Sequence, residues 1–467
     1  MKRKMAIILA GVLVLSPYSL NFGALKSISL VEADSIETVK AEEVEVNQTA
    51  NAYYEYVPEE INLIEKLDEQ VSQIEQDLET LQEQKLDPEL EKVVEEIQST
   101  DINQVVAEEI KDESDKLNLD NTEVIVETLE NDNISIEEAK DKLLEQNINQ
   151  SVTEQNTEVV EDNAISATLE GETPEENTGG ENVEDPIATA VENEDSGEAS
   201  PENVLLDSNF SVNIVKTDGE DTTVKELGEF VKEVVENNKN EQYSLINKNT
   251  ASASDSGWGW FFASQNTAVG NMNTTNAKFI NFGTITSSGG ILKPKSFSIS
   301  LTNKRKTTDD GSYSTHATKS IGNAKMGTSY YLESTIGGTY FWKGYSTFVG
   351  VFGDGSTDVD STSSDRELLN KKGVPYPTFK DPKSGKVMSV PSSTTWTKNY
   401  YPESWTTAKR TKYLDWYEDN YGDINRSDYE VHHIRPRVYY GSNDYSNLIP
   451  LKKSYHQQIV SPWWAAY

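Results

Sequence analysis

Residues 429–464 read YEVHHIRPRVYYGSNDYSNLIPLKKSYHQQIVSPWW and contain three of the four histidines of the chain. The local patterns predict a strand, a loop, a second strand and a short helix, in the order Tyr429–Ile434, Arg435–Ser446, Asn447–Leu451 and Lys453–Val460. We expect Pro462 to end the helix, because proline cannot donate a helical hydrogen bond. This arrangement would bring His432 and His433 within reach of His456.

The adjacent histidines suit phosphodiester hydrolysis, although a pair of histidines on a surface also occurs by chance. Neighbouring side chains of a strand point to opposite faces, so His432 and His433 suit two tasks better than one shared metal ion. The reaction needs a metal ion to neutralise charge on the phosphate and a base to activate water. His432 with His456 would hold the metal, and His433 would be the base. Neutral imidazole near pH 7 suits both tasks.

A known motif has the same residues at similar spacings. The run EVHHIRP at 430–436, followed by Gly441, SNL at 446–448 and His456, resembles the HNH (ββα-metal) nuclease motif. The whole string is similar to the C-terminal nuclease tips of bacterial polymorphic toxins and to the DNase domains of nuclease colicins. PYPTFKDPKSGKVMSVP at 375–391 resembles the lead-in of such toxins. The resemblance covers residues 366–467, about a fifth of the chain.

The resemblance implies a role for each matching residue. His433 would be the general base, and His432 and His456 would be metal ligands. Asn447 would fix the loop and orient His433, and Glu430 would support a ligand from behind.

One position departs from the colicin pattern. Colicin-type members carry another histidine one helical turn after the last ligand, and this chain has Val460 there. Two protein ligands with waters favour Mg²⁺ or Mn²⁺, and Zn²⁺ is the alternative.

The C-terminal region has the charge expected of a nucleic-acid partner. Residues 366–467 contain 15 basic and 10 acidic residues. We expect Arg435, Arg437, Lys452 and Lys453 to contact phosphates rather than base edges. DNA is the favoured substrate, and RNA is the other one that the motif allows. The adjacent Trp463 and Trp464 have two interpretations, packing in a core or stacking on bases, and we favour packing in a core.

Composition divides the chain into unlike parts. The 467 residues carry a formal net charge of −38. Residues 1–250 have 17 Lys and Arg against 61 Asp and Glu, whereas 251–467 have 24 against 18 and hold every Trp and His. We therefore expect several domains, with no core shared by the whole chain. The absence of cysteine excludes disulfides and thiolate sites.

The first 33 residues are typical of a signal peptide. Three basic residues at 2–4 precede the apolar run Met5–Leu15, which is shorter than the roughly 20 residues that span a membrane. We predict cleavage near Ala33, no span in the mature protein, and secretion through a Gram-positive-like envelope. An uncleaved anchor is the alternative.

The acidic part has helical patterns without chemistry. Residues 34–159 form the predicted helical, coiled-coil-like region, with an a/d seam that ends before Pro88. Residues 160–203 are a predicted disordered linker, and 204–250 a short helical segment with its pattern at Thr223–Asn237. One interpretation is a solvated spacer. The other is an arm that pairs with another helix or shields a basic partner.

Residues 251–365 are the predicted β-rich domain. Alternating runs with turn residues between them predict strands, at Lys278–Thr286, Ser296–Thr302, Ser329–Ser334 and Tyr345–Phe352. His316 lies in a polar stretch and is predicted to be a loop residue.

These features together predict a multidomain chain. It has an acidic helical and disordered N-terminal arm, a β-rich middle domain and a C-terminal α+β HNH nuclease domain at 366–467. The predicted function is a secreted toxin with metal-dependent endonuclease activity, for which the resemblance implies a cognate immunity protein. Two alternatives are a secreted scavenging nuclease and a surface or adhesin-like binding protein with a degenerate HNH domain.

Overall fold

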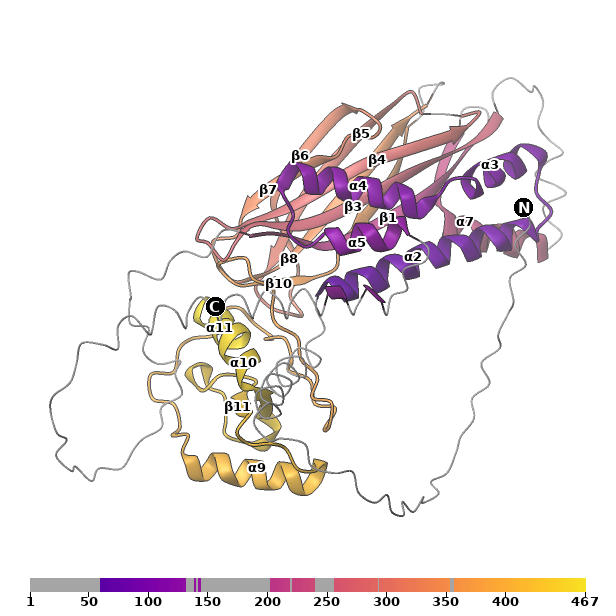
Figure 1. The fold of residues 1–467 in the computed structure, drawn as a ribbon. Helices are drawn as coiled ribbons and strands as arrows, with labels where there is room; N and C mark the ends of the chain where they lie inside the picture. The colour runs from indigo at the N-terminus through magenta and orange to yellow at the C-terminus, as the bar shows by residue number, and fades with distance from the viewer. Residues whose placement is uncertain are drawn as a thin grey trace, which may run out of the picture. The chain divides into compact units, whose positions relative to one another are not determined.

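The computed structural model describes residues 59–131, 138–139, 142–143, 202–218, 221–239, 256–292, 294–352 and 357–467. All of them belong to one compact unit, Thr49–Tyr467. The signal peptide predicted at 1–33 and nearly all of the linker predicted at 160–203 lie outside the described residues. The described chain has a β-rich body, helices against one of its sheets, and a smaller α+β region at the C-terminus (Figure 1).

Two antiparallel sheets form the body. The first sheet has the order β2-β1-β3-β4-β7, with bounds Asp221–Glu226, Glu202–Asp218, Ser256–Met272, Lys278–Gly290 and Tyr330–Thr335. The second has the order β10-β8-β5-β6, with bounds Glu367–Leu369, Tyr340–Val351, Ser296–Lys306 and Ser314–Ala324, and β9 (Thr357–Ser363) also pairs with β8. The strands predicted at four places in this region are confirmed as β4, β5, β7 and β8. His316 lies on β6, so its assignment to a loop was wrong.

The first sheet is the middle layer of three. One of its faces packs on the second sheet through a cluster that includes Phe261, Ile285, Ile299 and Phe348. Its other face packs on the helices (Figure 1). The strands at its centre are therefore buried on both faces, which removes the alternation between buried and exposed residues that marks a half-buried strand.

Among the described residues, five helices cover that face: α2 (Glu59–Gln82), α3 (Pro88–Gln98), α4 (Ile102–Leu117), α5 (Glu123–Glu130) and α7 (Leu227–Lys239). The predicted a/d seam is the buried stripe of α2, formed by Ile64, Leu67, Val71, Ile74, Leu78 and Leu81. It packs on α7, α3 and β1 of this chain. The helices thus share a core with the sheet, which the prediction of a separate arm did not include.

Acidic side chains of α3 meet donors on β3. Asp87 caps α3 through the amides of Glu89 and Leu90, and its other oxygen accepts from the Trp258 indole at 2.9 Å. The Trp260 indole donates to Glu96 at 3.2 Å. Part of the acidic charge therefore docks a helix on the sheet.

The segment 204–250 contains more strand than helix. Strands β1 and β2 come first, and α7 begins at Leu227, so the prediction of a helical segment holds only for its second half. The predicted helical pattern at Thr223–Asn237 begins four residues too early, inside β2.

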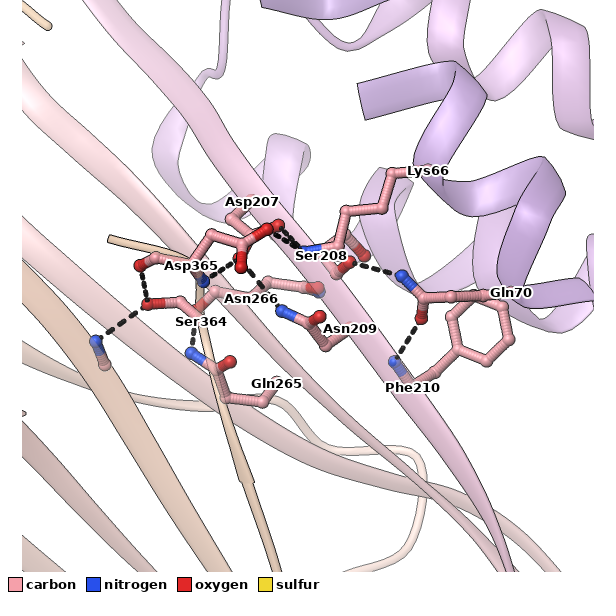
Figure 2. Close-up of polar contacts among 11 residues, drawn as sticks. Lys66, Gln70, Asp207, Ser208, Asn209, Phe210, Gln265, Asn266, Ser364 and Asp365 are labelled. Atoms are coloured by element: carbon pink, nitrogen blue, oxygen red, sulfur yellow. Dashed lines mark hydrogen bonds and ion pairs between the residues drawn. The ribbon is translucent and has the colours of Figure 1, made fainter. Parts of the chain in front are cut away.

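A polar junction ties α2 to the body (Figure 2). Lys66 on α2 donates to Asp207 on β1 at 2.6 Å and to Asp365, just before β10, at 2.7 Å. The Asp365 amide donates to Asp207 at 2.6 Å, and Gln70 pairs with the backbone of β1. This junction also borders a cavity of about 440 Å³. Tyr376 of the C-terminal region is one of the residues that line this cavity.

The C-terminal region packs on the end of the second sheet. It contains α9 (Thr407–Tyr421), the hairpin β11 (Tyr429–His433) and β12 (Leu448–Lys452), and the helical run α10 (Lys453–Tyr455), η3 (His456–Val460) and α11 (Ser461–Ala465). Phe341 of β8 and Leu368 of β10 share a core with Tyr376, Tyr439 and Trp464. No helix of the described residues is long and apolar enough to cross a membrane.

Candidate functional site

The three C-terminal histidines meet where a hairpin adjoins a helix. Strands β11 and β12 pair antiparallel, with His432 opposite Ile449 and His433 opposite Leu448. Glu430 and His432 are two residues apart on β11 and face the same side, whereas His433 faces the other. The helical run that follows β12 carries His456 to the first of these sides.

A chain of contacts links Glu430, His456 and His432. The Nδ1 atom of His456 lies 2.6 Å from a carboxylate oxygen of Glu430. The Nε2 atom of His456 lies 3.0 Å from Nδ1 of His432. Gln457 donates to the other carboxylate oxygen of Glu430 at 2.8 Å. Because a carboxylate only accepts, Nδ1 of His456 donates to Glu430.

Burial decides the charge of this group. His432 and His456 are 3% and 4% exposed. Burial, with His456 and His433 as neighbours, holds the pKa of His432 well below its ordinary value, so its ring is neutral near pH 7. The hydrogen bond from His456 lowers the pKa of Glu430, which is therefore a carboxylate. The Nε2 atom of His432 is buried and has no hydrogen-bond partner among the described residues.

His433 has separate surroundings. Its Nε2 atom lies 2.9 Å from Oδ1 of Asn443, and its ring stands edge-on to Trp405 with the centroids 4.7 Å apart. The amide of Asn443 is oriented by its Nδ2, which donates to the Ser404 carbonyl at 3.2 Å. The oxygen therefore faces His433, whose Nε2 donates to it.

Asn447 closes the loop between the strands. Its Oδ1 accepts from the Arg435 amide at 2.9 Å, and its Nδ2 donates to the carbonyls of Arg435 and Ser442 at 3.0 and 2.8 Å. Gly441 lies so close to the Arg435 carbonyl that any side chain there would overlap it. Asn447 thus braces the loop, as the resemblance implies, but the amide that contacts His433 belongs to Asn443.

The helix does not end at Pro462. The backbone stays helical from Lys453 to Ala465, and His456–Val460 is a π-helical turn in which the Ser461 amide donates to the His456 carbonyl. The π turn makes room for the proline, which is why the predicted end was wrong. Val460 is fully buried in the apolar core beside Trp463. The core interpretation of the Trp463–Trp464 pair is confirmed, at 1% and 2% exposure.

The four predicted phosphate contacts lie around this site in unlike settings. Arg435 stacks its guanidinium 4.5 Å from the Trp396 ring and donates to the Tyr439 carbonyl, so it also braces the loop. Arg437 donates to the Glu403 carbonyl at 2.9 Å. Lys452 lies 4.6 Å over the Tyr429 ring. Lys453, at the start of α10, is exposed.

The residues present fit a divalent metal ion that has two protein ligands, His432 and His456. The Nε2 atom of His456 and the Nδ1 atom of His432 face each other at 3.0 Å, so one metal ion could be bound by both nitrogens. A carboxylate behind a ligating histidine is the usual support of such a ligand. In the part of the chain that the structure describes, no three His, Asp or Glu side chains gather as a metal-binding group. Glu430 contacts the far nitrogen of His456 and is not a third ligand.

Sequence reasoning missed Asn443, Trp405 and Gln457. Gln457 is the residue directly after His456 in the predicted helix, and this position is a sequence signal for it. Asn443 is one of several polar residues in the loop, and Trp405 is distant in sequence, so no local pattern marks either. The cavity beside Lys66 is lined by other residues than these histidines.

Comparisons of the chain with protein-family models, with curated proteins and with solved structures found no match.

Proposed function

We propose that the C-terminal region, about 366–467, is a metal-dependent endonuclease that hydrolyses phosphodiester bonds. The observation that carries this proposal is the division of the histidines. His432 and His456 face each other with Glu430 behind, and His433 stands on the opposite side of the strand with its own orienting amide. A structural cluster of histidines would not need the two separate sets of partners.

His432 and His456 would hold the ion, which supplies charge neutralisation at the phosphate when it is bound. Glu430 accepts a hydrogen bond from Nδ1 of His456 and so leaves Nε2 directed at the site. Asn443 holds Nε2 of His433 and so orients the ring, and His433 would accept a proton from the attacking water. Asn447 and Arg435 hold the loop that carries Asn443.

The remaining parts of the proposal rest on the sequence. DNA is the favoured substrate because the motif resembles the DNase domains of nuclease colicins and the region is basic, and RNA is tested beside it because the motif does not determine the sugar. Mg²⁺ or Mn²⁺ is favoured over Zn²⁺ because only two protein ligands face the site. The segment 1–33 supports a secreted toxin, whose producer would need an immunity protein. A scavenging nuclease has the same chemistry and differs in being harmless when expressed in the cytoplasm.

The test uses two histidine variants of the full chain without residues 1–33. His433→Ala should lower the cleavage rate of plasmid DNA by about 10²–10⁴-fold and leave metal affinity unchanged, because it removes a positioned base. His432→Ala should weaken metal binding, so that part of its lost rate returns at high Mn²⁺. Initial rates and metal titrations by calorimetry measure both effects.

A matched control is His316→Ala, since His316 is exposed and lies on β6, away from this group. It should cleave at the wild-type rate. Wild-type cleavage by His433→Ala would contradict the enzyme proposal and favour a binding protein with a degenerate site. Equal defects that Mn²⁺ restores in both variants would contradict the assigned roles.

A further inference from the structure

Strands β5, β6 and β8 of the second sheet contain no Asp or Glu, although the chain carries a net charge of −38. Of their five basic residues, Lys304, Lys306 and Lys343 lie on the outward row, whereas Arg305 and Lys319 pair in register with the buried Trp342 and Leu301. Asp360 on β9 turns inward, where it accepts from Ser211 and Asn213. Helices α2, α3, α4, α5 and α7 lie on the other sheet and do not cover this face (Figure 1), whereas the C-terminal region packs on its end at Phe341.

Two lysines on this face lie directly opposite each other. Lys304 of β5 pairs in register with Lys343 of β8, and the next pair along is Thr302 with Tyr345. The burial pattern of both strands places these four side chains on the outward row. Like charges at opposed positions of neighbouring strands destabilise a sheet. No ion pair with another described residue offsets the charge of either lysine.

An aromatic ring holds both charges in place. The ammonium of Lys304 lies 3.7 Å from the centroid of the Tyr345 ring, and that of Lys343 lies 5.4 Å from it. Such contacts with a ring face are worth about 0.5–1 kcal/mol at an exposed site. They offset part of the repulsion and hold two positive groups at one place on a plane of Ser and Thr hydroxyls. This arrangement suits two neighbouring anions better than one carboxylate.

We propose that the face of Lys304, Lys343 and Tyr345 is a docking surface for the phosphate backbone of DNA. The choice of DNA rests on the nuclease function proposed above. It is favoured by continuity, because Lys306, two residues beyond Lys304, pairs in register with Phe341, which packs in the core of the C-terminal region. The row of lysines therefore leads to the region that carries the histidines.

The test measures DNA binding apart from cleavage. Full chain without residues 1–33 and with His433→Ala is titrated with a labelled 30-base-pair duplex in fluorescence anisotropy across a salt series. Lys304→Gln with Lys343→Gln should weaken binding and lower the slope of log K against log salt by about 1 for each lysine. The matched control is Lys278→Gln with Lys325→Gln, two lysines with the same charge change on β4 and after β6.

Binding that falls equally in both double variants would overturn the proposal, because net charge would then explain it. An unchanged salt slope in the Lys304 and Lys343 variant would overturn it as well. Heparin is titrated in parallel, and loss of heparin binding with unchanged DNA binding would assign the face to a sulfated glycan and also overturn the proposal. Absence of cleavage by the wild-type chain leaves these binding results intact, so the failure of the nuclease function would be recognised separately.

Discussion

At the residue scale, two asparagines in one loop have different tasks. Asn447 makes three hydrogen bonds with the backbone of the loop, whereas Asn443 makes one with His433 and one with the Ser404 carbonyl. The motif marks Asn447 through its fixed distance from the histidines. Asn443 contacts His433 only because the loop turns at Gly441 and returns along the strand. The spacing of residues in the sequence does not predict this path of the loop.

The two asparagines therefore have separable effects. Asn447→Ala should lower the stability of the C-terminal region by about 1–3 kcal/mol, because it leaves backbone groups of Arg435 and Ser442 without their partner. Asn443→Ala should leave the melting temperature almost unchanged and lower the cleavage rate. Asn443→Asp keeps an acceptor for Nε2 of His433 and should recover most of that rate. Melting curves and initial rates of the three variants measure this, and a rate that follows the melting temperature in all three would refute it.

At the element scale, alternation and turn residues predicted β5, β7 and β8, and also β4, although β4 is buried on both faces from Phe279 to Ile285. β1 and β3, which are also covered on both faces, were missed, and so was β6, an edge strand that is polar on both faces. The stripe of α2 was predicted correctly, but its partners are a strand and helices from distant parts of the sequence. Periodicity identifies a buried face and does not identify what covers it.

Helix α4 carries two buried carboxyl groups toward the sheet. Glu109 accepts from Ser264 and Asn266 of β3, and Glu113 accepts from Asn266 at 2.9 Å and from Ser329 at 2.9 Å. Burial raises the pKa of Glu109 from 4.5 to about 7 and raises the pKa of Glu113 well above 4.5, to which the charge of Glu109 adds. Both groups are therefore protonated in the folded chain at mildly acidic pH.

Stability should fall as pH rises from 4.5 to about 7. Between pH 4.5 and about 7 the unfolded chain releases a proton from Glu109 that the folded chain keeps, so folding becomes less favourable with rising pH. The loss for Glu109 is about 3 kcal/mol by pH 8. Melting temperatures from pH 5 to pH 8 should show it. Glu109→Gln with Glu113→Gln should flatten this dependence, and an equally steep curve in that variant would assign the effect to the general negative charge instead.

At the scale of the whole molecule, the acidic N-terminal helices and the β-rich body differ in composition, yet polar contacts and a shared apolar core join them. Asp87 and Glu96 of α3 accept from two indoles of β3, and α2 holds the body through Lys66. A change in composition along the sequence therefore does not mark the boundary of a core. The same holds at the other end, where β10 begins one residue after the predicted domain boundary at 366 and pairs with β8 on the far side of it.

The C-terminal region should depend on the second sheet for its stability. Phe341 of β8 is fully buried in the core of that region, so Phe341→Ala should open a cavity worth about 3–5 kcal/mol there. Hydrogen exchange followed by mass spectrometry should then accelerate at 374–390 and 453–465. Phe352→Ala is the matched control, because Phe352 is equally large and buried but packs between the two sheets. It should accelerate exchange in β5 and leave 453–465 slow. Slow exchange at 453–465 in both variants would instead show that the region keeps its core without the sheet, and cleavage by an isolated 366–467 would then equal that of the full chain.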